Sequence, residues 1–317
     1  MPTVLVTGAN GFLGTDLCKK LLYENYNVRC VVRPGQESHL PEGIELAKIE
    51  SLDGDTDWIE MLQGVDSVVH LAARVHVMKE STSDPFADYQ EVNVQGTERL
   101  AQSAAKCGVK RFIFMSSVKV NGGESVTPYR EADKPLPIDS YGISKLLAEK
   151  HVKRIAVETG MSFVILRPPL IYGPGVSANF LALMKFVDRG RLLPLAGVQN
   201  RRSLIYLENM VHAIITCIEH PNAEGNTYFV SDDEDVSTPD LIRMIGAALD
   251  QSARLFPVPA ILLFILGRLI GKGAFVDRLI GSLTVDISKI KQELKWQPPY
   301  TMVHGLQKTA AWYNETY

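Results

Sequence analysis

A tyrosine and a lysine four residues apart are the first candidates for chemistry in this chain. Tyr141 and Lys145 belong to the run YGISK at the start of a helical pattern, and residues at this spacing share one face of a helix. An ammonium group near a phenol lowers the phenol pKa from its usual value of about 10, which makes tyrosine a usable general acid or base. Ser117 follows an apolar run and is placed to hydrogen-bond the reacting oxygen. We therefore expect Ser117, Tyr141 and Lys145 to be catalytic, with the lysine also holding the ribose of a cofactor.

A glycine-rich loop near the N-terminus predicts that cofactor. Gly8, Gly11 and Gly14 lie in TGANGFLG, between an expected strand at Thr3–Thr7 and an expected helix at Phe12–Tyr23. The first glycine permits a tight turn, the second lets the backbone approach a pyrophosphate, and the third lets the helix pack on the strand. The free N–H groups and the dipole of the helix N-terminus favour the phosphates. The loop therefore predicts a bound dinucleotide, and an ordinary glycine-rich turn is the alternative.

The residue at the end of the second expected strand bears on which dinucleotide is bound. An acidic residue about 20 positions after the glycines commonly binds the adenine ribose. Arg33 stands there, 19 positions after Gly14, and no Asp or Glu does. Because a cation accommodates a 2′-phosphate, Arg33 slightly favours NADP over NAD. A solvent-facing arginine at a strand end is the alternative interpretation.

The elements that must position these residues alternate along the first half of the chain. Apolar runs typical of buried strands occur at Thr3–Thr7, Val28–Val32, Ile44–Ile49, Ser67–Leu71, Arg111–Met115 and Ser162–Leu166. Helical patterns occur at Phe12–Tyr23, Trp58–Leu62, Val92–Cys107, Tyr141–Thr159, Ala178–Arg189, Leu207–Glu219, Thr238–Leu249 and Ala260–Ile270. This alternation predicts an α/β fold, a Rossmann doubly wound parallel sheet with a smaller, mostly helical C-terminal lobe. We expect residues 1–166 to form the sheet domain, with part of 200–232 returning to it, and 167–317 to form mainly the substrate lobe.

Composition excludes several classes of protein. The 317 residues carry a net charge of −3, which does not favour a nucleic-acid partner. The four cysteines, Cys18, Cys30, Cys107 and Cys217, are scattered and read as reduced thiols, and no metal site is expected. The N-terminus shows no secretion signal, so a cytoplasmic protein is expected.

These motifs together resemble the extended short-chain dehydrogenase/reductase family over nearly the whole chain. Besides the glycine loop and YGISK, the matching elements are His70–Ala73, Asn93–Thr97, Ser116–Ser117, Arg167–Pro168, Tyr172–Pro174, Asn179, Arg201–Ser203 and Val285–Lys289. Within the family the chain looks most like the nucleotide-sugar enzymes, such as UDP-galactose 4-epimerase and the 4-keto-sugar reductases. The resemblance implies a UDP-sugar substrate and a homodimer.

The same resemblance implies roles for individual residues. Those expected to contact the cofactor are Gly8, Gly11, Phe12, Leu13, Gly14, Arg33, Leu71, Ala72, Ala73, Asn93, Ser116, Tyr141, Lys145 and Pro168. Those expected to contact the substrate are Arg74, His76, Ser117, Lys119, Asn121, Asn179, Arg202 and Arg278. Asn179 and Arg202 would hold the diphosphate, since an arginine fork suits that group. A solvated loop is the alternative for Arg201 and Arg202, and a structural role is equally open for His76.

Two departures from the family pattern point to an altered sugar pocket. Many relatives read S-x-x-V-Y-G after the serines, whereas here Asn121 replaces the tyrosine and Lys119 adds a charge. The run Arg74–Met78 follows the Leu-Ala-Ala turn, close to where a substrate should enter. These features resemble a subgroup that forms UDP-N-acetylquinovosamine by reducing a 4-keto-6-deoxy sugar nucleotide. We therefore expect a reductase of that kind, serving surface polysaccharide or O-antigen synthesis.

The catalytic residues leave other activities open. A UDP-glucose or UDP-N-acetylglucosamine 4-epimerase would use the same serine, tyrosine and lysine and would retain NAD. Dehydration is disfavoured because Val118 and Lys119 stand where dehydrating relatives carry Asp-Glu. A dinucleotide-binding scaffold or sensor is the non-enzymatic alternative, but such proteins tend to lose the tyrosine or the lysine.

The apolar run Leu255–Gly271 has three interpretations. Its unbroken apolar core, Ala260–Gly267, is far below the roughly 20 residues that a spanning helix needs. It belongs to the core of the lobe, to a homodimer face, or to a peripheral contact of residues 255–272 with the inner leaflet of a membrane.

Overall fold

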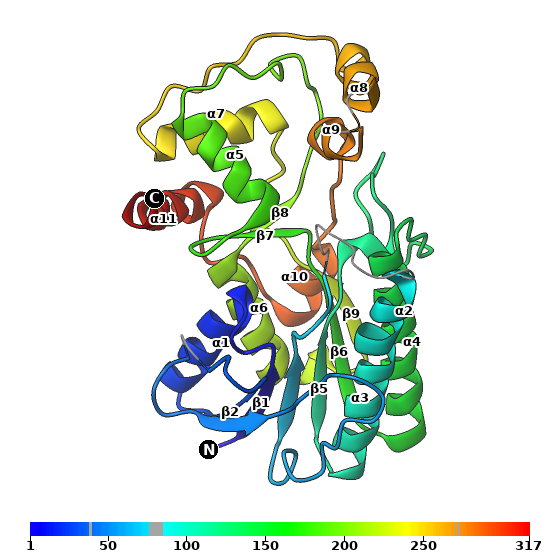
Figure 1. Ribbon diagram of the computed structural model, residues 1–317. Coiled ribbons are helices and arrows are strands. Elements are labelled where there is room, and N and C mark those ends of the chain that lie inside the picture. Colours follow the sequence, from blue (N-terminus) through cyan, green and yellow to red (C-terminus); the bar gives the residue numbers. More distant parts are fainter. Residues whose placement is uncertain (38–39, 76–84, 270, 272) are drawn as a thin grey trace.

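The computed structural model describes residues 1–37, 40–75, 85–269, 271 and 273–317, and within them a parallel sheet is the central layer (Figure 1). Its strands run in the order β3-β2-β1-β4-β5-β6-β9. Their bounds are Thr3–Thr7 for β1, Asn27–Val32 for β2, Glu45–Lys48 for β3, Ser67–His70 for β4, Arg111–Met115 for β5, Ser162–Arg167 for β6 and Asn226–Phe229 for β9. The order reverses beside β1, so the carboxyl ends of β1 and β4 open a crevice there. The predicted Rossmann sheet is confirmed.

Helices cover both faces of the sheet because the central strands are apolar on both sides. One face carries α1 (Phe12–Tyr23) and α6 (Leu207–Glu219), which contact one another. The other carries α2 (Pro85–Tyr89), the π-helical segment η1 (Gln90–Gln95), α3 (Gly96–Lys106) and α4 (Ser140–Thr159). Alternate residues of β1 divide between the two cores, with Val4 and Val6 in one and Leu5 in the other.

The remaining elements form a lobe at the carboxyl end of the sheet (Figure 1). Two short parallel strands, β7 (Leu170–Tyr172) and β8 (Leu204–Tyr206), lie at its base. Its helices are α5 (Ala178–Asp188), α7 (Thr238–Ala248), α8 (Ala260–Leu269), α9 (Gly273–Ile280) and α11 (Met302–Thr316), while α10 (Ser288–Leu294) contacts β9 at the sheet. Two one-turn helices complete the description, η2 (Val118–Val120) and η3 (Pro221–Ala223).

The sheet domain and the lobe are tied by backbone hydrogen bonds. Ser125 N donates to Ser282 O at 2.8 Å, and Tyr129 N donates to Thr284 O at 2.9 Å. Asp286 N donates back to Tyr129 O at 2.9 Å. The loop after β5 is therefore fastened to the segment that leaves α9.

Two predicted helices differ from the structure. The helix expected at Trp58–Leu62 is wrong: the chain makes turns there, and these turns bury Trp58 and Leu62. The helix expected at Val92–Cys107 begins earlier and is divided, with η1 preceding α3. Such π-helical turns occur where a helix must adapt to a nearby site.

Within the described residues no helix has the length and apolarity to cross a bilayer. The four cysteines are free thiols, and Cys18, Cys30 and Cys217 are buried.

Candidate active site

At the glycine loop, backbone segments approach each other so closely that side chains would not fit between them. Gly8 adopts φ +69°, and a Cβ there would lie 2.9 Å from Ala72 N. A Cβ on Gly14 would collide with the carbonyl oxygen of Gly8. That oxygen accepts a hydrogen bond from Gly11 N at 3.0 Å, which closes the turn before α1. The loop therefore presents the N-terminus of α1 to the crevice beside β1.

A cavity of about 360 Å³ opens next to this loop. Its wall includes Gly8, Arg33, Ala72 and Ala73, so predicted cofactor residues from β1, β2 and β4 meet there. Arg33 is exposed at the end of β2. Because the loop is free of Cβ atoms where a pyrophosphate must approach, and the cavity adjoins it, the residues present fit a dinucleotide.

The serine and the tyrosine meet at the carboxyl end of β5. Ser117 caps η2, where its Oγ accepts from Lys119 N at 3.2 Å, and its side chain also hydrogen-bonds Tyr141. Asp139 caps α4 by accepting from Gly142 N at 2.7 Å. A Cβ on Gly142 would lie 2.6 Å from Lys119 O, so only glycine lets the first turn of α4 approach η2 so closely. The YG pair thus brings the phenol to the serine.

Lys145 lies one turn further along α4 and is buried. Its Nζ donates to Met115 O at 2.8 Å and lies 4.6 Å from the centre of the Phe114 ring. Burial lowers the pKa of Lys145 to about 7, although the carboxylate of Glu149 acts in the opposite direction. The ammonium group is therefore held at the end of β5 and changes charge near neutral pH.

The pKa of Tyr141 differs from the expectation. Burial raises it above its usual value, the charge of Asp139 adds to the rise, and the hydrogen bond with Ser117 opposes it. The predicted lowering by the lysine is absent because the Lys145 ammonium group is directed at the carbonyl of Met115. The phenol of Tyr141 therefore holds its proton more tightly than a solvated tyrosine does, and the hydrogen bond with Ser117 is the contact that favours the phenolate.

A buried polar chain lies directly beneath these residues, and sequence reasoning missed its centre. Arg167 donates to Glu149 through Nε at 2.8 Å and through Nη2 at 2.5 Å. Ser116 Oγ donates to Glu149 Oε1 at 2.5 Å, so this serine points into the core and away from the crevice. Arg167 Nη1 donates to Asn121 Oδ1 at 3.0 Å. These hydrogen bonds connect β5, α4, β6 and η2 into one rigid support.

Asn93 holds the loop after β4. Its Oδ1 accepts from Arg74 N at 2.7 Å, and its Nδ2 donates to Arg74 O and to Ser144 Oγ, each at 3.0 Å. The side chain of Arg74 pairs with Asp88 at 2.7 Å and lines the dinucleotide cavity. Direct contacts of Asn93 with the cofactor and of Arg74 with the substrate stay predictions.

The remaining predicted cofactor residues lie in the segments that follow β1, β4 and β6. Thr7 Oγ1 accepts from Ala72 N at 3.2 Å, and Leu71 N donates to Thr7 O at 3.3 Å. Pro168 O accepts from Val118 N at 3.0 Å, which fixes the end of β6 to η2. Phe12 and Leu13 begin α1 and pack in the core.

The predicted substrate residues divide between two cavities. Lys119, Asn121 and Arg278 line a polar cleft of about 920 Å³, where Lys119 Nζ lies 3.6 Å from Asp139. Asn179, Arg202 and Arg278 line a second cavity within the lobe. Arg278 borders both, so the two are adjacent. His76 lies outside the described residues.

Comparison with known proteins agrees with this geometry. The fold and the glycine loop define a dinucleotide-binding enzyme of the Rossmann type. A family model described as "NAD dependent epimerase/dehydratase family" matches residues 4–231, and the chain belongs to this family. Nucleotide-sugar epimerases are members of it, and NAD is its cofactor.

Curated relatives span almost the whole chain. A UDP-glucose 4-epimerase of Vibrio cholerae is 43% identical over 97% of this chain and 94% of its own length. An Escherichia coli O157:H7 protein named N-acetyl-α-D-glucosaminyl-diphospho-ditrans,octacis-undecaprenol 4-epimerase is 28% identical over 96% of this chain and 93% of its own.

Solved structures share the fold. The UDP-glucuronic acid 4-epimerase of Bacillus cereus in complex with NAD has a TM-score of 0.81 at 24% identity, covering 99% of this chain and 97% of that one. A UDP-glucose 4-epimerase of Thermotoga maritima has a TM-score of 0.78 at 25% identity, covering 99% of both chains. These comparisons give no support to the preference for NADP that Arg33 suggested, nor to the quinovosamine-forming branch.

Proposed function

We propose that this protein is an NAD-dependent 4-epimerase of a UDP-linked hexose or N-acetylhexosamine. The observation that carries the proposal is the hydrogen-bonded pair of Ser117 and Tyr141 beside the buried Lys145, at the carboxyl end of β5, on the same edge of the sheet as the glycine loop. The 43% identical 4-epimerase supports it over nearly the full chain.

The side chains perform the proton transfer at the C4 oxygen of the sugar. Tyr141 accepts the hydroxyl proton as the C4–H bond breaks and returns it when that bond forms again. Ser117 donates a hydrogen bond to the same oxygen and holds it beside the phenol. The hydrogen bond with Ser117 favours the phenolate, because it opposes the rise of the Tyr141 pKa that burial causes. Lys145 is then the expected contact to the ribose of the cofactor. The chemistry that NAD supplies when bound at the glycine loop is the acceptance and return of one hydride.

In this proposal the substrate diphosphate binds in the second cavity, the one within the lobe. Arg202 and Arg278 offer guanidinium groups, and Asn179 lies in the first turn of α5. Lys119 and Asn121 in the polar cleft then face the sugar. The names of the relatives agree on a sugar diphosphate or nucleotide sugar but differ in what the diphosphate is joined to.

The experiment is incubation of the purified protein with UDP-N-acetylglucosamine or UDP-glucose without added reductant. The expected result is interconversion of the C4 epimers with no net change in the dinucleotide. Absence of interconversion, with the protein folded and NAD bound, would overturn the proposal.

A 4-keto-sugar reductase is the second candidate, and Arg33 at the end of β2 is the observation that favours it. Such an enzyme would consume one NADPH for each 4-keto-6-deoxy sugar nucleotide. Arg33→Ala is then expected to weaken NADPH binding more than NADH binding, and equal effects on both would remove this support.

The predicted homodimer belongs to the same proposal. Light scattering after size-exclusion chromatography tests it, and a mass of one chain at micromolar concentration would contradict it.

A further inference from the structure

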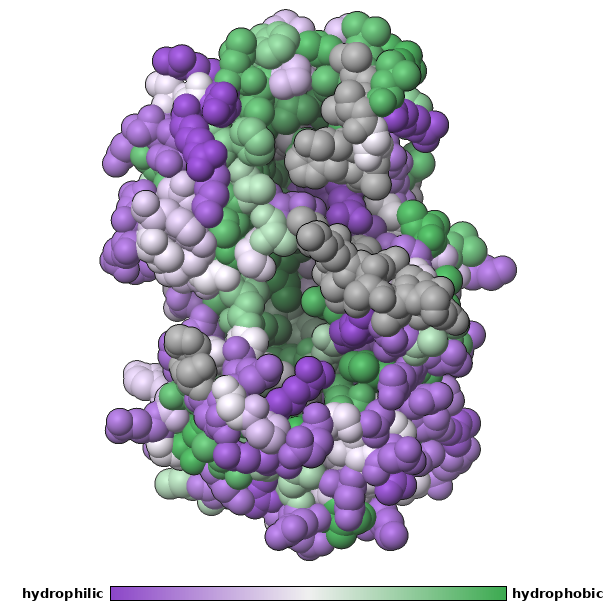
Figure 2. Space-filling model, in the orientation of Figure 1, coloured by the Kyte–Doolittle hydropathy of each residue, from purple (hydrophilic) through white to green (hydrophobic). Residues whose placement is uncertain are grey.

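The catalytic phenol requires more than one contact to hold it in place. Figure 2 shows that the molecular surface is hollowed between the sheet domain and the lobe. Tyr141 lies in the first turn of α4, and its side chain is only partly buried. The hydrogen bond with Ser117 fixes the tip of this side chain but does not fix the plane of its ring. A second contact must therefore set the ring plane if the phenol oxygen is to meet the sugar.

A second tyrosine supplies a contact of this kind. The ring centres of Tyr89 and Tyr141 lie 6.4 Å apart and the ring planes meet at 64°, which is an edge-to-face arrangement. Aromatic pairs favour this geometry because the positive edge of one ring meets the negative face of the other. The contact therefore restricts both the position and the tilt of the Tyr141 ring.

Tyr89 is buried without belonging to a hydrophobic core. Its side chain is 4% exposed, yet neither of the two cores formed by the described residues includes it. A large apolar ring that is buried usually packs into such a core. The burial of Tyr89 therefore serves the surroundings of Tyr141 more than the packing of the sheet.

The segment that carries Tyr89 is fixed on both sides of this residue. Asp88 pairs with the side chain of Arg74 at 2.7 Å, and Asn93 hydrogen-bonds both backbone groups of Arg74. Since Arg74 lines the dinucleotide cavity, α2 and η1 are fastened to the loop that follows β4. Tyr89 therefore stands on a rigid support, as a side chain that positions another must.

The same segment also reaches the backbone of the catalytic residue. Asn93 Nδ2 donates to Ser144 Oγ at 3.0 Å, and Ser144 Oγ donates to Tyr141 O at 2.8 Å. Both α2 and η1 contact α4, and Figure 1 shows them beside it. Tyr89 and Asn93 are four residues apart, and the residues that they meet on α4 are three apart, so both contacts join the same two helix faces. Tyr141 is thus held at its ring by Tyr89 and at its carbonyl by Ser144.

From these contacts we propose that Tyr89 is a positioning residue for the proton transfer at C4, with its ring holding the Tyr141 phenol in the orientation that reaches Ser117 and the sugar. The inference rests on the 4-epimerase activity proposed above, and it adds a residue that acts through Tyr141 and not on the substrate. The ring of Tyr89, and not its hydroxyl group, performs this role.

Crystal structures of the NAD-bound full chain test the positioning without turnover. Tyr89→Leu removes the ring, Tyr89→Met removes it while a longer, flexible chain fills part of its volume, and Tyr89→Phe keeps it. We expect the hydrogen bond between Ser117 and Tyr141 to be kept in Tyr89→Phe and lost in the other two variants. An intact hydrogen bond in both Tyr89→Leu and Tyr89→Met would overturn the proposal.

Steady-state kinetics of C4 epimerisation supply the second measurement. Tyr89→Leu and Tyr89→Met should lower kcat about tenfold, because a misplaced phenol slows proton transfer, while KM and the Kd of NAD stay within about twofold. Tyr89→Phe should keep kcat within about threefold of the unaltered protein, because the ring contact remains. A rise in KM at constant kcat, or an equal loss of kcat in all three variants, would contradict a role of the ring in positioning.

Tyr26→Leu is the matched control, because it removes another buried tyrosine ring, which stands just before β2 and away from the carboxyl ends of the strands. It is expected to lower the melting temperature but to keep kcat and the hydrogen bond between Ser117 and Tyr141. Equal losses of kcat in Tyr26→Leu and Tyr89→Leu would show general destabilisation and remove Tyr89 from its role. If the unaltered protein interconverts no epimers while Tyr89→Leu and Tyr89→Met lose the hydrogen bond, the 4-epimerase activity is overturned and the positioning role of Tyr89 is supported.

Discussion

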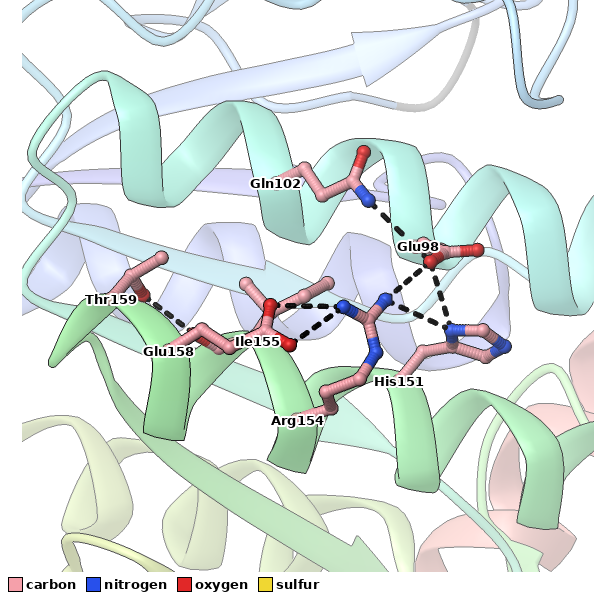
Figure 3. Close-up of polar contacts among 7 residues, drawn as sticks. All are labelled: Glu98, Gln102, His151, Arg154, Ile155, Glu158 and Thr159. Carbon is pink, nitrogen blue, oxygen red and sulfur yellow. Dashed lines mark hydrogen bonds and ion pairs between the residues drawn. The ribbon is translucent and has the colours of Figure 1, made fainter.

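The two sides of α4 carry the same kinds of charged side chain in opposite surroundings. On the inner side Tyr141, Lys145 and Glu149 follow one another at intervals of four residues toward the sheet. On the outer side Arg154 pairs with Glu158 at 2.9 Å and with Glu98 of α3 at 2.6 Å, and His151 lies 2.9 Å from Glu98 (Figure 3). On the inner side Lys145 and Glu149 are buried, whereas Arg154 and Glu158 are exposed and Glu98 and His151 are partly exposed. Position relative to the sheet, and not residue type, therefore separates a site from a solvated face.

Removing the phenolic hydroxyl of the inner tyrosine is expected to have the largest effect. Tyr141→Phe should lower kcat for C4 epimerisation about 10³-fold, because proton transfer at the C4 oxygen is lost. Binding of UDP measured by calorimetry should stay within about twofold. Tyr23→Phe, at a tyrosine that is 79% exposed, is the control and should retain full activity. Substantial turnover by Tyr141→Phe would remove this residue from the mechanism.

Breaking the inner ion pair should cost far more stability than breaking an outer one. Glu149→Gln leaves the Arg167 guanidinium buried beside a neutral amide, and we expect a loss of about 3–5 kcal/mol in the free energy of unfolding. Glu158→Gln, on the same helix, should cost less than about 1 kcal/mol because its pair with Arg154 is exposed. Urea denaturation of both variants measures the difference. Similar losses in the two variants would contradict the contrast between the faces.

The glycines at the two ends of α4 offer a third test. Gly142→Ala places a methyl group against Lys119 O and should displace Tyr141 from Ser117, lowering kcat about 100-fold. Gly160→Ala meets open space but forces a side chain to φ +76°, so it should lower stability by about 1 kcal/mol and leave kcat unchanged. Steady-state rates together with thermal denaturation distinguish the two. A fully active Gly142→Ala enzyme would show that the close approach is unnecessary.

The smallest expected effect is a pH dependence of stability. The pKa of Lys145 is about 7 in the fold and 10.5 ordinarily, so between these pH values the unfolded chain binds a proton that the folded chain does not. The free energy of unfolding should therefore rise with pH, by about 2 kcal/mol from pH 7 to pH 9. Lys145→Met should abolish this rise, whereas Lys150→Met, at an exposed lysine of α4, should keep it. Denaturant titrations at pH 7 and pH 9 measure the free energy of unfolding. A rise of this free energy that persists in Lys145→Met would contradict the prediction.

Short sequence motifs predicted those parts of the site that depend on a single helical turn or on the loop after a single strand. The glycines of the first loop and the spacing of Tyr141 and Lys145 are of this kind, because each depends on neighbours close in sequence. Glu149 was missed although it continues that spacing, since a charged residue on a helix is usually solvated. Its partner Arg167 stands 18 residues away and meets it only when β6 pairs with β5.

The sequence misled where tertiary packing decides. Trp58–Leu62 has a helical pattern, but the stretch turns to bury its large side chains against Leu52 and Leu100. The Ser116 hydroxyl donates to the carboxylate of Glu149 in the core. The sequence around Ser116 does not predict this contact, because Glu149 stands 33 residues away. We expected the Lys145 ammonium group to act on the phenol of Tyr141, but it donates a hydrogen bond to the backbone carbonyl of Met115 instead.

The backbone hydrogen bonds between the loop after β5 and the segment after α9 have a consequence for folding. Ser125, Tyr129 and Asp286 join stretches more than 150 residues apart in the chain. Separating the lobe from the sheet would expose these amides and carbonyls at once, so the free energy of that opening approaches the free energy of global unfolding. The protein should therefore melt as one cooperative unit, and slow amide exchange of Ser125 and Tyr129 would report it.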